Sequence, residues 1–376
     1  PSACFRAGHS RPNLRIQKLV VKMNQIKRLV GLQAAFITEE HTMAETAQTR
    51  HRIAVLYTGG TIGMQASSDG LTPSKATVLE ALAAYQNEVD WQVQVCEPLI
   101  DSSQVMPQHW QAWQQWVLAQ QCDGILILHG TDTMAYSANV LAFALGKVPV
   151  PIIITGAQHP LGTLDGDAEF NLDCAVQALL KKAAPKAVSM VFDGEILMAV
   201  GSRKISTRSL HGFANKNQAA WAIWQQGQWT SLQAACVPES AHAKVPLQAD
   251  LRIASHYCVP VNEQWALRLL LQSGQADAVI VQSFGHGNGL FSAADRAAMQ
   301  AFQARGGLII NVSQVADGHV AAEYEASQAL RDVGVFMAGA WTVETAYAKA
   351  LVGLSAGKRG ADLQAYLQQN VLGEWN

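Results

Sequence analysis

Short apolar runs alternate with helical stretches along most of this chain. In the first half, the runs that suit buried strands cover residues 52–58, 91–97, 124–129, 150–155 and 187–193. Helical stretches occupy the intervals, at residues 76–87, 107–121, 134–146 and 167–182. Because parallel strands need long crossover connections, which are usually helices, this alternation predicts an α/β fold with a parallel sheet and helices on both of its faces.

The alternation stops once and then resumes. The segment VPESAHAKVPLQA, residues 237–249, has two prolines and no apolar periodicity, so we interpret it as a linker. Strand candidates follow at 251–256, 278–282 and 308–312, with helical stretches at 262–273 and 293–304. Since 376 residues are many for a single core, we predict an N-terminal α/β domain at 51–236, a linker at 237–250 and a smaller C-terminal α/β domain at 251–376.

Two of the predicted strands end in a glycine-threonine turn, RIAVLYTGGTIG at residues 52–63 and GILILHGTDTM at residues 124–134. Ligands bind beyond the carboxyl ends of parallel strands, so Thr61, Thr131 and Asp132 are expected to share one pocket. Two hydroxyls beside a carboxylate suit catalysis by a hydroxyl nucleophile, which needs a neighbouring base. Each turn alone also fits a purely structural role, in which Asp132 and Thr133 only cap the next helix.

Further motifs make these turns resemble the bacterial-type L-asparaginases, and in particular their cytoplasmic type I branch. The motifs occur in the family's order: TGGTIGMQ (58–65), DSS (101–103), HGTDTMAY (129–136), TGAQ-P (155–160), a lysine nine residues before the phenylalanine of GFANKN (Lys204 and Phe213), and GHGNG (285–289). The resemblance extends from residue 52 to the C-terminus. It implies a larger, flavodoxin-like N-terminal domain, followed by a smaller C-terminal α/β domain.

The resemblance also implies catalytic roles for four residues. Thr61 is similar to the family's nucleophile, which attacks the side-chain amide carbon of asparagine and forms an aspartyl ester that water then hydrolyses. Thr131, Asp132 and Lys204 are similar to a second triad, in which the lysine eases removal of a threonine proton. The expected activity is therefore hydrolysis of L-asparagine to L-aspartate and ammonia, without a metal or other cofactor.

Three residues are expected to bind the substrate on the same grounds. Ser102, together with Ser103, resembles the family's site for the α-carboxylate, and Asp132 would pair with the α-ammonium group. In the family, the asparagine of GHGNG comes from the C-terminal domain of the neighbouring subunit, which makes Asn288 a substrate-site candidate. The resemblance thus implies a homodimer or a homotetramer.

One departure from the family pattern matters for the chemistry. Relatives have a tyrosine in the flexible loop after the nucleophile turn, where it helps to activate the threonine and closes the site. The matching position in SSDGLTP (67–73) is Leu71, and no tyrosine occurs between Tyr57 and Tyr85. Either another residue supplies this hydroxyl, or the second triad carries more of the proton transfer. The segment itself suits a lid, because it is rich in Gly, Ser and Asp and ends at Pro73.

The composition limits the classes of partner. The formal net charge is −2, which gives no indication of nucleic-acid binding. The six cysteines are scattered, without a CxxC pair or a Cys/His cluster at ligand spacing, which favours reduced thiols in a cytoplasmic protein and argues against a structural metal. No run reaches the roughly 18 consecutive apolar residues of a membrane span, so no membrane partner is expected.

Residues 1–50 do not conform to the family pattern. Residues 1–38 hold seven basic residues and no acidic one, as a transit peptide can, but little serine. The chain begins with proline, and Met43 lies shortly before the first strand. We therefore expect that the reading frame is extended at its N-terminus and that Met43 is the true start.

Alternatives to an asparaginase stay open at this point. A related amidase would prefer glutamine, and an amidotransferase subunit would act on aminoacyl-tRNA, which ordinarily needs a docking surface that this nearly neutral chain does not advertise. From a different class, the fold could belong to a metabolite-binding regulator that lost catalysis together with the lid tyrosine. Release of ammonia from asparagine or glutamine separates the two amidases, and binding without turnover would support the regulator.

Overall fold

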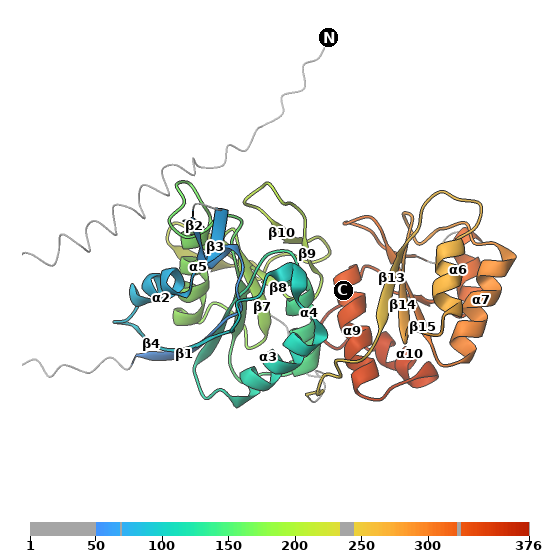
Figure 1. Ribbon diagram of the computed structural model, residues 1–376, viewed down its shortest axis with the longest axis horizontal. Helices are drawn as coiled ribbons and strands as arrows, with labels where there is room; N and C mark the ends of the chain where they lie inside the picture. Colours follow the sequence, from blue (N-terminus) through green and yellow to red (C-terminus); the bar gives the residue numbers. More distant parts are fainter. Residues whose placement is uncertain (1–49, 68–69, 234–243, 322–324, 376) are drawn as a thin grey trace, which may run out of the picture. The chain divides into compact units, whose positions relative to one another are not determined.

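The computed structural model describes residues 50–67, 70–233, 244–321 and 325–375, and Figure 1 shows their helices and strands. The predicted fold class is confirmed: a large, mostly parallel sheet forms the N-terminal domain, and a smaller parallel sheet forms the C-terminal one. Residues 1–49 of the predicted extension and residues 237–243 of the predicted linker lie outside the described residues. The exact domain boundaries stay a prediction.

The N-terminal sheet has eight strands in the order β12-β11-β8-β7-β6-β5-β1-β4. Strands β4, β1, β5, β6 and β7 are parallel, and β8 and β11 continue the sheet in antiparallel pairings. The central strands are apolar runs buried along their whole length, as strands covered on both faces require. The strand bounds are β1 (His51–Tyr57), β4 (Val89–Val95), β5 (Gly124–Leu128), β6 (Ile152–Thr155), β7 (Val188–Phe192), β8 (Glu195–Met198), β11 (Ala222–Gln225) and β12 (Gln228–Ser231).

Helices cover both faces of this sheet (Figure 1): α2 (Lys75–Ala83) and α5 (Ala168–Leu180) lie on one side, and α3 (Pro107–Ala119) and α4 (Met134–Leu145) on the other. A hydrogen bond of 2.9 Å from the Tyr85 hydroxyl to Asp173 joins the end of the α2 segment to α5. In the sheet, β6 lies next to β5 and β7 lies next to β6, so the chain moves in the same direction across the sheet at both connections. The connecting helices, α4 and α5, nevertheless lie on opposite faces of the sheet. The crossover through α5 therefore has the opposite hand to the crossover through α4, although such connections nearly always share one hand.

Two small antiparallel sheets stand apart from the main one. Strands β2 (Met64–Ser67) and β3 (Gly70–Pro73) form a hairpin directly after a 3-10 turn, η1 (Thr61–Gly63). Strands β9 (Ser202–Lys204) and β10 (Phe213–Asn215) form the other pair. A second 3-10 turn, η2 (Ser102–Gln104), precedes α3.

The C-terminal domain is built on a four-stranded parallel sheet in the order β13-β14-β15-β16. Its strands are β13 (Ile253–Tyr257), β14 (Ala278–Ser283), β15 (Leu308–Ser313) and β16 (Phe336–Met337). Its helices are α6 (Trp265–Gln272), α7 (Ala293–Ala304), α8 (Glu325–Asp332), α9 (Val343–Ser355) and α10 (Gly360–Gln368). Helix α9 packs along α4, and one cluster of buried apolar residues runs through both domains.

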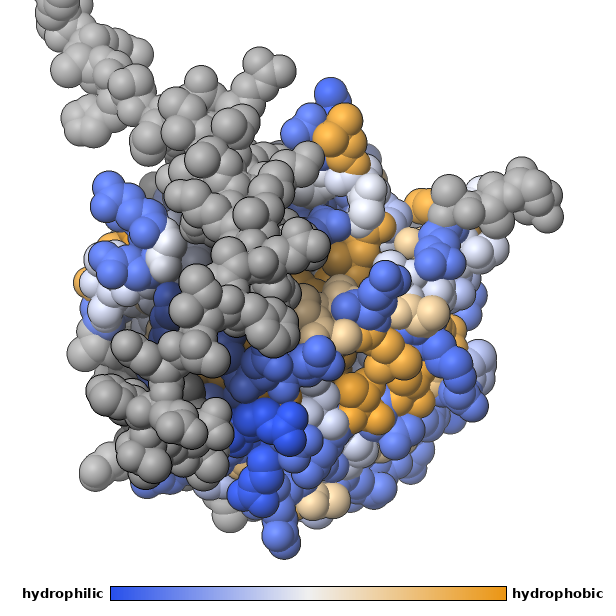
Figure 2. All heavy atoms as spheres, turned by 90° about the vertical axis from the view of Figure 1, so that its left-hand side faces the viewer, coloured by the Kyte–Doolittle hydropathy of each residue, from blue (hydrophilic) through white to orange (hydrophobic). Residues whose placement is uncertain are grey.

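The surface mixes apolar and polar side chains. Figure 2 views the side that carries α2 and α5 and shows apolar areas next to strongly hydrophilic ones. In the C-terminal domain, six exposed large apolar residues end or follow β13, lie on α6 or follow the GHGNG turn: Tyr257, Val259, Val261, Trp265, Leu269 and Leu290. None of the helices in the described ranges combines the length and the apolar character that crossing a bilayer requires.

Candidate active site

The two glycine-threonine turns lie against each other at the carboxyl edge of the sheet. Strands β1 and β5 are parallel neighbours, so their ends project the turns to the same place. Gly60 has a positive φ of 91°, and a Cβ atom placed on it would lie only 2.3 Å from the Cα of Gly130. Such close backbone contact requires glycine on both sides. The glycines of the two motifs therefore bring the segments of Thr61 and Thr131 together.

Lys204 joins the second turn through its ammonium group. Its Nζ atom donates hydrogen bonds to Thr131 Oγ1 at 2.8 Å and to Asp132 Oδ1 at 2.7 Å. The Thr131 residue is buried and the Lys204 side chain is 16% exposed, whereas the Asp132 side chain is 60% exposed. A cation next to a hydroxyl stabilises negative charge on that oxygen, so this cluster is suited to proton removal from Thr131.

Ser102 connects the DSS motif to the same turn. Its buried hydroxyl accepts the N–H of Asp132 at 3.2 Å, and its carbonyl accepts a hydrogen bond of 2.6 Å from the Thr133 hydroxyl. Thr133 is the N-cap residue of α4 but makes no side-chain capping bond, and the Asp132 carboxylate accepts from Lys204. The purely capping role considered for these two residues is therefore wrong. Ser103 is exposed and binds Asp101 through its N–H at 2.9 Å, so these contacts join Ser102, and not Ser103, to the turn.

Thr61 begins η1 and is half-buried. Its turn leads directly into the β2–β3 hairpin, whose second strand carries Leu71 opposite Ala66. The segment that we expected to be a loop is thus a two-stranded sheet at its described residues. Leu71 is 52% exposed there, and it gives the hairpin an apolar side chain where a tyrosine was expected.

A third turn, TGAQ after β6, is fixed by one buried carboxylate. The two oxygens of Asp167 accept the N–H groups of Gln158 and His159, each at 2.9 Å. The side chain of Gln158 in turn donates to the carbonyl of Ser206 at 2.9 Å, in the segment that follows Lys204. The turn after β6 therefore supports the segment that carries Lys204.

Beneath the Thr131 turn runs a buried chain of hydrogen bonds that sequence reasoning missed. His129 Nδ1 lies 2.6 Å from the carbonyl oxygen of Gly130, and its Nε2 lies 2.8 Å from Ser137 Oγ, which also accepts from Trp110 Nε1 at 2.8 Å. Because a carbonyl only accepts, Nδ1 carries the hydrogen and Nε2 accepts from the serine hydroxyl. Full burial lowers the pKa of His129 to about 4, so the ring stays neutral. The only signal for this chain of hydrogen bonds in the sequence was a histidine next to a glycine-rich turn, eight positions before a serine.

Asn288 lies in the C-terminal domain and makes its main-chain hydrogen bonds there. It closes a tight turn with Phe284 through bonds of 2.9 and 2.8 Å. Asn311 and Ser313 of β15 hold the glycine carbonyls of that turn, at 3.1 and 2.7 Å. The Asn288 Oδ1 atom is buried and has no hydrogen-bond partner within the described residues. The described contacts bring together Thr131, Asp132, Lys204 and Ser102, and Asn288 is not among them.

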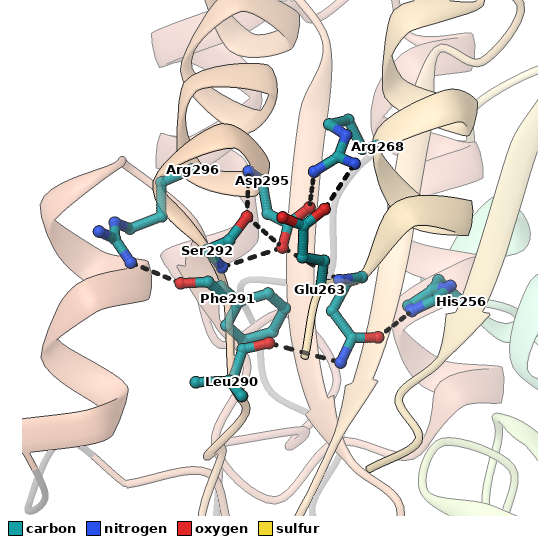
Figure 3. A network of polar contacts seen from close by, with 9 residues as sticks. His256, Glu263, Arg268, Leu290, Phe291, Ser292, Asp295 and Arg296 are labelled. Atoms are coloured by element: carbon teal, nitrogen blue, oxygen red, sulfur yellow. Dashed lines mark hydrogen bonds and ion pairs between the residues drawn. The ribbon is translucent and has the colours of Figure 1, made fainter. Parts of the chain in front are cut away.

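A buried polar network fixes the segment after Asn288 (Figure 3). The fully buried carboxylate of Asp295 accepts from the N–H and the hydroxyl of Ser292, each at 2.9 Å, and from Arg268 at 3.1 Å. The Gln264 side chain reaches the carbonyl of Leu290 at 3.4 Å. These bonds tie the starts of α6 and α7 to each other and to Leu290, the residue directly after the GHGNG turn.

The charged groups of the site form an ion pair with each other. Among the described residues, no group of three or more His, Cys, Asp or Glu side chains is arranged to hold a metal ion. The Lys204 ammonium and the Asp132 carboxylate form an ion pair, and the Thr131 hydroxyl is the third member of the cluster. This arrangement can bind a charged amino acid and can move a proton to or from a hydroxyl.

Comparisons with known proteins agree with this architecture. The asparaginase N-terminal family model matches residues 52–236, and the glutaminase/asparaginase C-terminal domain model matches residues 252–367. L-asparaginase 1 of Escherichia coli K12 is 29% identical over 336 residues, which cover 86% of this chain and 97% of that protein. L-asparaginase I of Vibrio cholerae has a similar structure, with a TM-score of 0.75 and 27% identity over 87% of this chain and 99% of that one. The thermostable L-asparaginase of Thermococcus kodakarensis shares the fold, with a TM-score of 0.77 and 21% identity over 86% of this chain and 99% of that one. The chain therefore belongs to the asparaginase family of amidohydrolases.

Proposed function

We propose that this protein hydrolyses L-asparagine to L-aspartate and ammonia with Thr61 as the nucleophile. The observation that carries the proposal is the Lys204 ammonium, which bonds both Thr131 and Asp132 at the edge of the sheet. L-asparaginases of known structure are similar to this chain over nearly their whole length, which supports the choice of substrate.

The reaction takes place in two steps. In the first, the Thr61 hydroxyl oxygen attacks the side-chain amide carbon of asparagine, the threonine proton passes to the departing nitrogen, and ammonia leaves an aspartyl ester on Thr61. In the second, water attacks the ester carbon, one water proton returns to the Thr61 oxygen, and aspartate is released. The Thr131 hydroxyl takes part in proton transfer, and Lys204 stabilises negative charge on its oxygen as the proton moves.

Substrate binding follows from the charges of a free amino acid. A zwitterion needs one site for its carboxylate and one for its ammonium group. Ser102 Oγ accepts the N–H of Asp132, so the hydroxyl still has its own hydrogen to donate to the α-carboxylate. Asp132 bonds Lys204 through Oδ1, and its second oxygen can receive the α-ammonium group. We retain Ser103 as a second donor from the same DSS motif.

A second copy of the chain belongs to this proposal. Asn288 Oδ1 is buried without a partner within the described residues, and the exposed apolar side chain of Leu290 follows its turn directly. We propose that Asn288 completes the substrate site of a neighbouring subunit in a homodimer or homotetramer. Mixing inactive Lys204→Met subunits with inactive Asn288→Ala subunits tests this. If the subunits pair at random, half of the dimers contain one subunit of each variant, and one of the two sites in such a dimer is intact. The mixture would then regain up to about a quarter of the wild-type activity. Activity that stays at the level of the separate variants would contradict the shared site.

A cytoplasmic location completes the proposal. The described cysteines are free: Cys96, Cys122, Cys174 and Cys258. Free thiols are usual in reducing compartments, where disulfides are rare. Labelling of the native and the unfolded protein with a thiol reagent, before and after reduction, shows whether these cysteines are reduced in the cell.

A steady-state assay of ammonia release tests the substrate. We expect turnover of L-asparagine with a kcat/KM well above that for L-glutamine. A higher kcat/KM for L-glutamine would make the chain a glutaminase, and binding of either amino acid without ammonia release would make it a regulator. Either result would overturn the proposed function.

A further inference from the structure

We propose that Thr345 on α9 and Asn139 on α4 form a clamp that positions Lys204, so that the C-terminal domain sets the geometry of a cluster in the N-terminal domain. The inference rests on the proposed catalytic role of Lys204. Both clamp residues act through the strand that carries the lysine and do not touch the substrate, so they are positioning residues.

The strand β9 needs such support because it is short. It has three residues, pairs only with the equally short β10, and is not part of the eight-stranded sheet. Its first residue follows Gly201, whose N–H lies 3.0 Å from Thr345 Oγ1 and 3.3 Å from Asn139 Oδ1. The carbonyl of Ser202 accepts from Asn139 Nδ2 at 3.5 Å. The clamp therefore holds the main chain two and three residues before Lys204.

The clamp residues also bind each other, and their donors and acceptors match. The Thr345 hydroxyl donates to Asn139 Oδ1 at 2.8 Å and accepts from Gly201. The exposed fractions of Asn139 and Thr345 are 0% and 1%, so water does not replace these partners. Removing the Thr345 hydroxyl takes away the nearer acceptor of the half-buried Gly201 N–H and leaves it only Asn139 Oδ1 at 3.3 Å. The loss of a hydrogen-bond partner costs stability at this point of the main chain.

Asn139 links the strand to α4, the helix that follows the turn of Thr131 and Asp132. Its Nδ2 donates to the carbonyl of Ala135 at 2.8 Å, in the first turn of α4. That helix begins directly after Asp132 and Thr133. One buried side chain thus bonds the first turn of the helix that follows Thr131 and Asp132 and also the strand that carries Lys204.

Helix α9 makes a second contact with the strand. The Glu344 carboxylate lies 3.8 Å from Arg203 Nε, and the two side chains are 8% and 23% exposed. Side chains alternate along a strand, so Arg203 points away from the side of Lys204. The first turn of α9 therefore fixes β9 at the main chain of Gly201 and at the side chain of Arg203.

Precise placement matters because Lys204 meets two acceptors at once. Its hydrogen bonds of 2.8 and 2.7 Å leave little room for movement, since such bonds weaken steeply with distance and angle. A displacement of about 1 Å in a catalytic group can lower the rate about 100-fold.

The test uses Thr345→Val, which keeps the shape of the side chain and removes the hydroxyl, with Thr345→Ser as the conservative variant that restores it. Ser355→Ala is the matched control, because Ser355 lies on the same helix, is buried, and loses a hydrogen bond of 3.0 Å to Gln248 that does not involve β9. We expect Thr345→Val to lower kcat by about 10- to 100-fold with little change in KM. Thr345→Ser and Ser355→Ala should keep kcat within a factor of about three.

A double-mutant cycle separates positioning from a structural defect. If Thr345 acts through Lys204, Thr345→Val lowers kcat further by less than a factor of about two when Lys204→Met is already present. Hydrogen exchange of the segment 199–204 is the second readout, and it should speed up in Thr345→Val but not in Ser355→Ala. Wild-type kcat in Thr345→Val, an unchanged exchange rate, or the same loss of kcat in both backgrounds would overturn the clamp. Wild-type activity in Lys204→Met would overturn the catalytic role of Lys204 and with it the positioning role of the clamp, whereas hydrolysis of L-asparagine by Thr61 would stand.

Discussion

Lys204 and Thr131 lie 73 positions apart in the chain, yet the lysine Nζ is 2.8 Å from the threonine Oγ1. The contact joins β9, a strand outside the main sheet, to the turn after β5, one of the most buried strands within it. A charged side chain directed at a buried hydroxyl costs desolvation, and the ion pair with Asp132 offsets part of that cost.

Removal of the Thr131 hydroxyl should abolish turnover. We expect Thr131→Val to lower kcat by about three to six powers of ten, because residues that act as a unit lose nearly all activity together. Thr131→Ser keeps a hydroxyl for Lys204 and should retain much more activity. Steady-state ammonia release measures both variants, and circular dichroism verifies that each is folded. Equal activity of the valine and serine variants would show that the hydroxyl is not used.

Neutralising the lysine should affect catalysis more than folding. Lys204→Met keeps the length of the side chain and removes the charge, and we expect kcat to fall by about 100- to 10,000-fold, the usual contribution of assisted proton transfer. Lys216→Met is a control for lost charge, because Lys216 is exposed directly after β10 and has no place in the proposed site. If Lys204→Met turns over asparagine at the wild-type rate, Lys204 has no catalytic role.

The sequence was sufficient to predict the elements that have a strong local pattern. Strands such as β5 and β6 are continuous apolar runs, and helix α7, with Ser292 as its cap, begins and ends where the pattern predicts. The prediction failed where structure depends on distant partners. Strands β8, β11 and β12 are short and gain their hydrogen bonds only from the edge of a sheet already formed.

The candidate site was predictable to the same extent. Turns with glycine at the end of a buried strand indicated Thr61 and Thr131, and the distance to Phe213 within the family pattern indicated Lys204. Nothing in the sequence indicated Thr345, which reaches Asn139 across 206 positions, because no local pattern reports a contact between domains. The hairpin β2–β3 was expected as a loop, since its polar, glycine-containing sequence lacks the alternation of a half-buried strand.

Leu71 offers a gain-of-function prediction. If a lid hydroxyl assists the nucleophile in relatives, Leu71→Tyr should raise kcat, because acid-base assistance is worth about 100-fold where the geometry permits. Leu71 is 52% exposed on β3, so a larger side chain fits there without disturbing a core. Leu71→Phe is the matched control that adds the ring without the hydroxyl. An equal or lower kcat in Leu71→Tyr than in Leu71→Phe would show that this site uses a different activator.

His129 predicts how stability depends on pH. Burial lowers its pKa from 6.5 to about 4, so between these values the unfolded chain binds a proton that the native protein does not. The free energy of unfolding should therefore fall as the pH drops from about 6.5 to about 4, by up to about 3 kcal/mol from this residue. Urea titrations of the wild type and of His129→Gln measure the two slopes. The variant should have the shallower slope over this range, and parallel slopes would contradict a buried neutral histidine.

The central claim is that Thr61 carries out the hydrolysis of L-asparagine, and ammonia release by wild type, Thr61→Ser and Thr61→Ala tests it most directly. We predict turnover by the wild type, measurable turnover by Thr61→Ser, and loss of about three to six powers of ten in kcat for a folded Thr61→Ala that still binds L-asparagine. Isothermal titration calorimetry measures that binding. A wild-type protein that releases no ammonia from L-asparagine, or a Thr61→Ala variant with near-normal kcat, would contradict the account.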